Sequence, residues 1–244
     1  MIKKAKIRPL FKREDRQDIQ NYRPISILSV FSKIIEKLIY NKLVSFLKKH
    51  NALANVQHEF MEKTSTGTAS HSFIESVQEA LDSHVHVVGI FLNLYKTYDV
   101  INHNMLLDKV DSYGVRGSAN MWFKSYLTNR TNIIEISQTC RSSHTQRIFQ
   151  SLPRVTAHGV LQGSILGPLL YFIYINDLPL NIWEAKLVLY ADDTNIFSLV
   201  KMKKLYKPNY LIMKQLVRFL KNVLIVNTTK TVVMSFHLCQ SKSQ

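Results

Sequence analysis

Cysteine, glycine and proline are scarce in this chain of 244 residues, which contains 2, 7 and 6 of them. Cys140 and Cys239 lie far apart, so we expect neither a disulfide scaffold nor a cysteine-based zinc site, and the composition fits a reducing compartment. The shortage of glycine and proline excludes a collagen-like or linker composition. Because 46% of the residues are hydrophobic, the chain is not expected to be wholly disordered.

Long apolar runs are also missing. The longest, from Ile165 to Ile175, contains Gly167 and Pro168, whereas a membrane-spanning helix needs roughly 20 apolar residues in succession. The basic start of the chain lacks the apolar core of a signal peptide. The sequence therefore predicts neither a transmembrane helix nor a secretory signal.

Acidic residues are outnumbered by basic ones. There are 17 Asp and Glu against 32 Lys and Arg, which gives a net charge of +15 at pH 7. Such a surface attracts polyanions such as nucleic acids, with an affinity that falls steeply as salt is added. The alternative is a basic protein that has no nucleic-acid ligand.

Apolar spacing predicts a mixture of helices and strands without a regular βαβ rhythm, which favours an α+β fold. A helix from Ser29 or Ser32 to about Lys49 is expected to bury one face. The apolar residues of that face are Phe31, Ile34, Ile35, Leu38, Ile39, Leu43, Phe46 and Leu47. Further helices are expected at about 66–83, 118–128, 163–176 and 209–222, and strands at 86–92, 132–137, 187–190, 194–199, 223–226 and 231–236.

The segment from Tyr190 to Asp193 carries two adjacent carboxylates, Asp192 and Asp193, between two apolar runs. The pattern predicts a hairpin with both carboxylates at its tip. Magnesium prefers oxygen ligands, and a pair of such ions promotes phosphoryl transfer. A solvated turn is the alternative interpretation, since Asp is common in turns.

The segment 190–193 is the last of six short motifs that follow one another along the chain. They are residues 21–26, 57–60, 91–103, 159–170, 174–178 and 190–193. In this order they resemble the reverse transcriptase domain of non-LTR retrotransposons, especially the jockey-like elements of animals, from about Ile7 to Phe236. The resemblance implies an α+β right-hand polymerase with fingers (1–85) and a palm (86–240) that has a central antiparallel sheet and helical insertions. The thumb is expected to be missing.

The resemblance also implies the roles of residues in the palm. Asp192 and Asp193 match metal-binding carboxylates, and the family binds two Mg²⁺ ions there, with Mn²⁺ as the alternative. Asn93 stands where the family has its first catalytic aspartate. Tyr98 matches an aromatic gate against the ribose 2′-hydroxyl of the incoming nucleotide. Lys230 matches a lysine near the pyrophosphate leaving group that acts as a proton donor, although an exposed lysine at a strand end is the alternative.

Four residues are expected to contact nucleotide or template. Gln162 matches a family residue with that role, and Gly163 permits a close backbone approach. Lys12 belongs to the basic N-terminal segment, which either contacts phosphates or is a solvated face, and Arg23 lies in the first matching segment.

Asn93 is the departure with the largest expected effect. An amide oxygen ligates magnesium but brings no charge. One pair of unit charges near 4 Å at an effective dielectric constant of about 20 contributes roughly 4 kcal/mol, which corresponds to about a thousandfold in rate. Asp99 is not expected to substitute, because six residues on a strand span roughly 20 Å, and even in a turn its side chain would point in a different direction. Met61, Leu161, Tyr95 and Thr97 also depart from the family pattern and suggest a degenerate copy.

The sequence therefore predicts the RNA-directed DNA polymerase domain of a retrotransposon, with weak or no activity. Its expected partners are an RNA template, a DNA primer and deoxynucleoside triphosphates, in the nucleus or a cytoplasmic ribonucleoprotein. The alternative is a non-catalytic RNA- or DNA-binding module derived from the polymerase fold. The sequence does not define the oligomeric state.

Overall fold

The computed structural model describes residues 3–12, 14–54, 56, 65–139, 146–182, 185–190, 193–200, 212, 214–219 and 224–237. Helices and strands are mixed, and most strand pairs are antiparallel, which confirms the predicted α+β class. The chain forms two compact units, each built from two stretches of sequence. Unit 1 is Met1–Ala52 with Ile101–Tyr174, and unit 2 is Leu53–Val100 with Ile175–Gln244. No helix of the described residues is long and apolar enough to cross a membrane.

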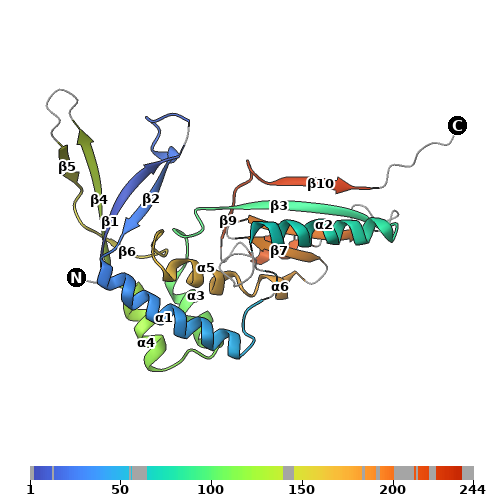
Figure 1. Cartoon of the computed structure of the whole chain (residues 1–244), viewed down its shortest axis with the longest axis horizontal. Helices are drawn as coiled ribbons and strands as arrows, with labels where there is room; N and C mark the ends of the chain where they lie inside the picture. The colour runs from blue at the N-terminus through green and yellow to red at the C-terminus, as the bar shows by residue number, and fades with distance from the viewer. Residues whose placement is uncertain are drawn as a thin grey trace. The chain divides into compact units, whose positions relative to one another are not determined.

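Unit 1 contains a sheet in the order β2-β1-β4-β5, with β6 paired to β4 (Figure 1). The parallel pairing of β1 with β4 joins the two stretches of sequence, and the other pairs are antiparallel. The strands β5 and β6 are short and largely exposed, so no apolar alternation predicts them. The strands are β1 (Lys4–Phe11), β2 (Tyr22–Ile27), β4 (Arg130–Thr139), β5 (Gln146–Gln150) and β6 (Arg154–Thr156).

The helices of unit 1 begin at side-chain caps or at glycine. The Ser29 hydroxyl accepts a hydrogen bond from the Ser32 amide at 3.2 Å and so caps α1 where the sequence predicts it. Asn102 caps α3, a helix that is not among those predicted from the sequence. The helices are η1 (Ile19–Asn21), α1 (Val30–Lys49), α3 (His103–Ser112), α4 (Ser118–Leu127) and α5 (Leu166–Ile175), the last residue of which belongs to unit 2.

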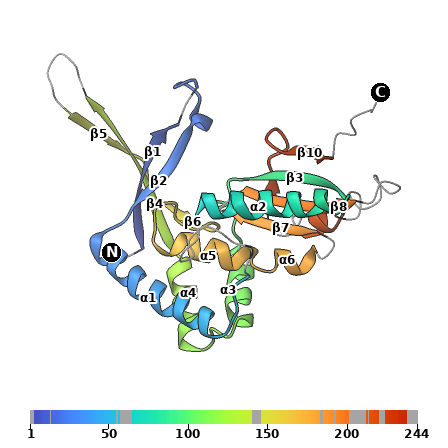
Figure 2. The same ribbon diagram turned by 45° about the vertical axis from the view of Figure 1, so that its right-hand side comes forward.

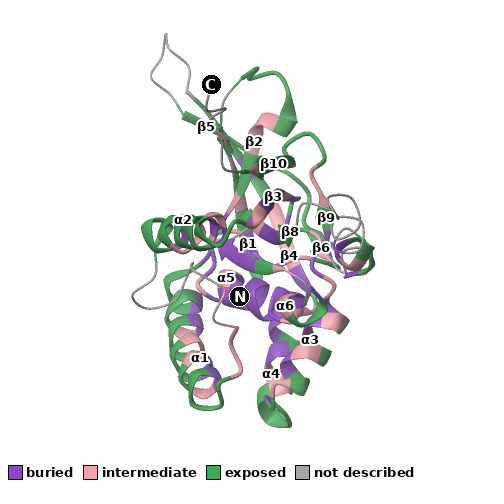
Figure 3. Cartoon of the chain, turned by 90° about the vertical axis from the view of Figure 1, so that its right-hand side faces the viewer, coloured by how far each residue is buried: buried purple, intermediate pink, exposed green. Residues whose placement is uncertain are grey.

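The apolar face of α1 is only partly buried, contrary to the sequence prediction. Leu43 and Leu47 are buried, but Phe31, Ile34 and Leu38 are exposed. Figure 3 shows exposed positions along much of the helix. The spacing of apolar residues correctly predicts the helix but does not reveal how wide a face the rest of the chain covers.

Unit 2 is built on an antiparallel sheet in the order β10-β3-β8-β7, with β9 paired to β3. Figure 2 shows α2 lying across this sheet. Ala69, Val77 and Ala80 of the helix join Val188 and Phe197 of the strands in one apolar cluster. The elements are α2 (Thr66–Asp82), β3 (His86–Tyr95), α6 (Leu178–Asn181), β7 (Lys186–Tyr190), β8 (Asp193–Val200), β9 (Ile225–Val226) and β10 (Val232–Phe236), with helical residues also at 212 and 214–219.

Candidate active site

Asn93 and Asp193 face each other across two neighbouring strands of unit 2. They are register partners of β3 and β8, and β8 in turn pairs with β7 so that Asp193 lies opposite Tyr190. The Nδ2 atom of Asn93 donates a hydrogen bond to Oδ1 of Asp193 at 3.1 Å. The predicted β7–β8 hairpin is therefore present, and it brings Asp193 next to Asn93, the residue that we expect to stand in place of the family aspartate.

Asp192 and the neighbouring Ala191 lie outside the described residues. The role of Asp192 as a metal ligand therefore stays a prediction. The same is true of the departure at Met61, which lies in the undescribed segment 57–64.

The chain turns sharply after β3. Lys96 has a left-handed backbone with φ of 46°, and the Asp99 amide donates to the Lys96 carbonyl at 2.8 Å. The strand β3 therefore ends at Tyr95 and residues 96–99 form a turn, and the expectation that Asp99 does not substitute for the family aspartate stays a prediction. Protein packed around the Asp99 carboxyl raises its pKa, and the Lys96 ammonium partly offsets this effect. Tyr98, the predicted nucleotide gate, lies half-buried in the same turn.

A second turn is attached directly to the backbone of Asn93. The Asn227 amide donates to the Asn93 carbonyl at 2.9 Å, and the Lys230 amide donates to the Asn227 carbonyl at 3.2 Å. The Lys230 side chain is exposed. The structure thus links Asn93 to Asp193 through side chains and to the turn of Lys230 through the backbone, which the sequence alone does not reveal.

The predicted template contacts of unit 1 surround the β1–β2 hairpin. Lys12 follows β1, and its amide donates to the Asn21 carbonyl at 2.9 Å, while Arg23 is exposed on β2. The Gln162 carbonyl accepts a hydrogen bond from the Ser26 amide at 2.7 Å.

The contact between Gln162 and Ser26 explains why residue 163 is a glycine. Its φ is +103°, and a Cβ atom placed there would lie 2.9 Å from the Ser26 carbonyl oxygen. The close backbone approach that the sequence predicts at Gly163 is therefore made by β2 of the same chain.

Glu36 holds the start of α5, the helix that follows Gln162 and Gly163. This buried carboxylate accepts hydrogen bonds from the Tyr126 hydroxyl at 2.8 Å and from the Ile165 amide at 2.7 Å. Burial, together with the negative charge of Glu36, raises the pKa of the Tyr126 hydroxyl, which therefore stays a donor at every physiological pH. Sequence reasoning missed this anchor, although an acidic residue within the apolar face of a helix is a signal for one.

Glu135 of β4 forms ion pairs with two basic residues of β1. Its side chain is 3% exposed and lies 2.8 Å from both Lys6 Nζ and Arg8 Nη2, while the Gln150 amide also donates to it. Hydrogen bonds from Lys6, Arg8 and Gln150 lower the pKa of Glu135 to about 2. Part of the basic N-terminal segment is thus held in place by an internal carboxylate.

The described side chains beside β3 and β8 offer one carboxylate to a divalent cation. Asp193 supplies one carboxylate, and its neighbour Asn93 presents an N–H donor to it rather than a second negative charge. Among the residues that the structure describes, no group of three or more His, Cys, Asp or Glu side chains could hold a metal ion.

Comparison with known proteins places these features in a family. A profile of the reverse transcriptase (RNA-dependent DNA polymerase) family matches residues 2–243. A probable RNA-directed DNA polymerase from transposon BS of Drosophila melanogaster is 34% identical over 187 residues, which cover 71% of this chain and 19% of that protein. The RNA-directed DNA polymerase from mobile element jockey of the same species is 28% identical over 188 residues, 74% of this chain and 19% of that protein.

Solved structures show the same fold. Apo telomerase from Candida tropicalis, truncated from its C-terminal domain, superposes with a TM-score of 0.63 at 12% identity, covering 98% of this chain and 51% of that one. Telomerase from the same species in complex with the TWJ fragment of telomeric RNA gives a TM-score of 0.62 at 12% identity, covering 96% and 41%. The α+β arrangement with antiparallel sheets thus agrees with the fingers and palm of a polymerase.

Proposed function

Because the chain belongs to the reverse transcriptase family, as a domain of the non-LTR retrotransposon type, we propose that it is a polymerase domain whose nucleotidyl transfer is impaired. It would bind an RNA template, a DNA primer and a deoxynucleoside triphosphate. The hydrogen bond between Asn93 and Asp193 carries this proposal, because it places the uncharged amide of Asn93 directly beside the carboxylate of Asp193. The chain spans about a fifth of the curated relatives that it matches, 19% of each.

The reaction explains why the missing charge matters. The 3′-hydroxyl oxygen of the primer attacks the α-phosphorus of the nucleotide, and the new P–O bond forms as the bond to pyrophosphate breaks. Paired divalent cations supply charge stabilisation for this step in the family, and they need a concentration of carboxylates. With Asn93, one unit charge is lost, which at about 4 kcal/mol corresponds to roughly a thousandfold in rate.

The distribution of charge supports binding of the template and primer. Unit 1 contains twenty Lys and Arg against seven Asp and Glu, whereas unit 2 contains twelve against ten. Unit 1 also contains Lys12, Arg23 and Gln162, which we assign to template or nucleotide contact. Lys230, exposed in the turn attached to Asn93, is assigned to the side of the leaving pyrophosphate.

The test compares the unchanged chain with Asn93→Asp. Extension of an oligo(dT) primer on poly(rA) is measured with Mg²⁺ and with Mn²⁺, at saturating template and primer. We expect Asn93→Asp to extend the primer about a thousandfold faster, because it restores the carboxylate beside Asp193. Asn104→Asp, on an exposed residue of α3, changes the net charge equally and should leave the rate unchanged.

Equal rates for the unchanged chain and Asn93→Asp would contradict the proposed impairment. If neither chain extends the primer although both bind the duplex by fluorescence anisotropy, the non-catalytic binding module is the correct interpretation. The +15 charge favours that second function, since it supports binding and says nothing about catalysis.

A further inference from the structure

The outward face of α1 exposes an unusual amount of apolar surface. Val30, Phe31, Ile34 and Leu38, here called the α1 stripe, are 71%, 76%, 52% and 59% exposed. Their spacing of three and four residues places them on one side of the helix. Soluble proteins rarely leave such a contiguous apolar patch uncovered unless another molecule binds there.

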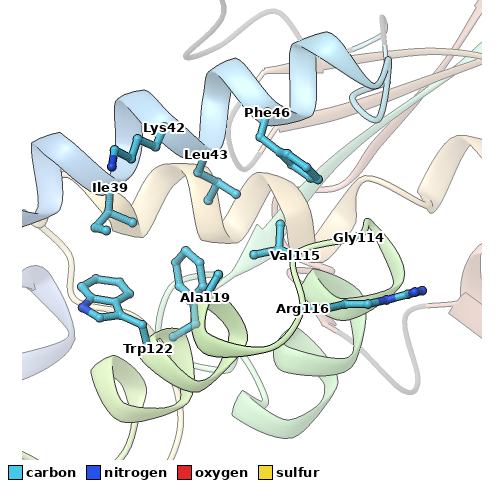
Figure 4. Close-up of a pocket in the computed structure, with 10 residues that line it drawn as sticks. Ile39, Lys42, Leu43, Phe46, Gly114, Val115, Arg116, Ala119 and Trp122 are labelled. Atoms are coloured by element: carbon cyan, nitrogen blue, oxygen red, sulfur yellow. The ribbon is translucent and has the colours of Figure 1, made fainter.

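The same helix also forms one wall of a pocket of about 360 Å³, which lies between α1 and α4 (Figure 4). Ile39, Leu43 and Phe46 form its α1 wall, and Val115, Trp122 and Phe123 line the opposite side. The aromatic wall is well supported, because Trp122 stacks on Tyr126 with ring centroids 5.3 Å apart and an interplanar angle of 13°.

The stripe and the pocket are close to each other along α1. Leu38 and Lys42 are one helical turn apart, and Lys42 lines the pocket. The pocket is within the size range of ligand sites, roughly 300–1,000 Å³, so it has room for an aromatic or branched side chain.

Every exposed charge on α1 is positive. Its five lysines are exposed, whereas its one acidic residue, Glu36, is 1% exposed and bonds inward to Tyr126 and Ile165. Arg116 adds a cation at the opposite side of the pocket, where it pairs with Asp111 at 3.6 Å. The lysines are Lys33, Lys37, Lys42, Lys48 and Lys49.

We propose that the α1 stripe and its pocket dock an acidic amphipathic helix of a protein partner. The apolar side of that helix covers the stripe and places one aromatic or branched residue in the pocket, and its carboxylates face the lysines. The inference does not depend on polymerase activity.

The features of the surface favour this occupant over others. A second copy of the chain would bring lysines against lysines, which repel. Nucleic acid would contact the cations but would leave the aliphatic side chains of the stripe, Val30, Ile34 and Leu38, without a matching surface. A bilayer has no protruding side chain to fill a concave aromatic pocket, whereas a helix anchors one.

The test uses a fluorescein-labelled synthetic helix of about 18 residues, long enough for about five turns, with leucine and one phenylalanine on one side and glutamate on the other. Its binding to the full chain is followed by anisotropy. Phe31→Ser with Leu38→Ser, and separately Ala119→Trp to fill the pocket, should each weaken binding about tenfold or more, because each removes buried apolar contact. Leu180→Ser, an equally conservative change of an exposed leucine on α6, should have no effect.

Circular dichroism must show that the variants remain folded, which is expected because the changed residues are exposed. A peptide with lysine in place of glutamate should not bind. Equal binding of both peptides, or peptide affinity unchanged in the stripe and pocket variants, would overturn the proposal. Self-association of the chain that the stripe variants abolish would also overturn it. The same holds if the chain binds phosphatidylserine vesicles or single-stranded RNA instead of the peptide, and if the stripe and pocket variants weaken that binding.

Discussion

At the scale of single residues, the Asn93–Asp193 pair predicts how the end of the sheet responds to a second carboxylate. Asn93→Asp would place two carboxylates opposite each other across β3 and β8. Like charges in cross-strand positions destabilise, so the melting temperature without divalent cations should fall by about 2 °C. Added Mg²⁺ should reverse this loss in the variant and leave the unchanged chain unaffected, as measured by thermal melting followed by circular dichroism. A loss that Mg²⁺ does not reverse would contradict the interpretation.

Glu135 predicts a particular pH dependence of stability. Its pKa in the folded chain is about 2, below the ordinary value of 4.5, because Lys6, Arg8 and Gln150 donate hydrogen bonds to it. The folded state therefore favours the charged form, and this stabilisation is complete above about pH 5 and lost as the pH falls toward about 2. The urea concentration at the midpoint of unfolding should therefore decrease as the pH is lowered through that range. In the Glu135→Gln variant this decrease should be smaller. An identical pH profile for the variant would contradict this assignment.

At the scale of elements, one carboxylate connects α1, α4 and the start of α5. Tyr126→Phe removes the hydroxyl that donates to Glu36 and leaves a buried charge with one hydrogen bond fewer. The free energy of unfolding should fall by about 1–3 kcal/mol, as measured by urea denaturation. Tyr40→Phe is the matched control on α1 and should change stability by less than about 0.5 kcal/mol.

The elements also show what a sequence can predict. The apolar periods and caps correctly predict α1, α2, α4 and the β7–β8 hairpin, because local spacing decides them. The strands β5 and β6 are not predicted, since their exposed residues carry no apolar period, whereas α3 is missed although its buried residues Leu106, Leu107 and Val110 have helical spacing. The resemblance to the family indicates that Asn93 and Asp193 lie close together. The hydrogen bond from Asn227 to Asn93 is not predictable in this way, because it joins the backbones of two residues 134 positions apart in the sequence.

At the scale of the whole molecule, the excess of positive charge in unit 1 predicts where nucleic acid binds. Affinity for an RNA–DNA duplex should fall at least about a hundredfold between about 50 and about 200 mM salt. Arg23→Gln in unit 1 should reduce the slope of log affinity against log salt by about 1, whereas Lys214→Gln in unit 2 should change it little. Equal effects of the two variants, or a flat salt dependence, would show that unit 1 is not the nucleic-acid surface.

The path of the chain between the two units limits how this protein can be shortened. The backbone leaves unit 1 after residue 52, returns at residue 101 and leaves again after residue 174. A single proteolytic cut therefore cannot release either unit intact. During translation, β1 can pair with β4 only after β4 has emerged from the ribosome. A premature stop codon before residue 130 would thus leave β1 without its parallel neighbour, rather than yield a smaller working domain.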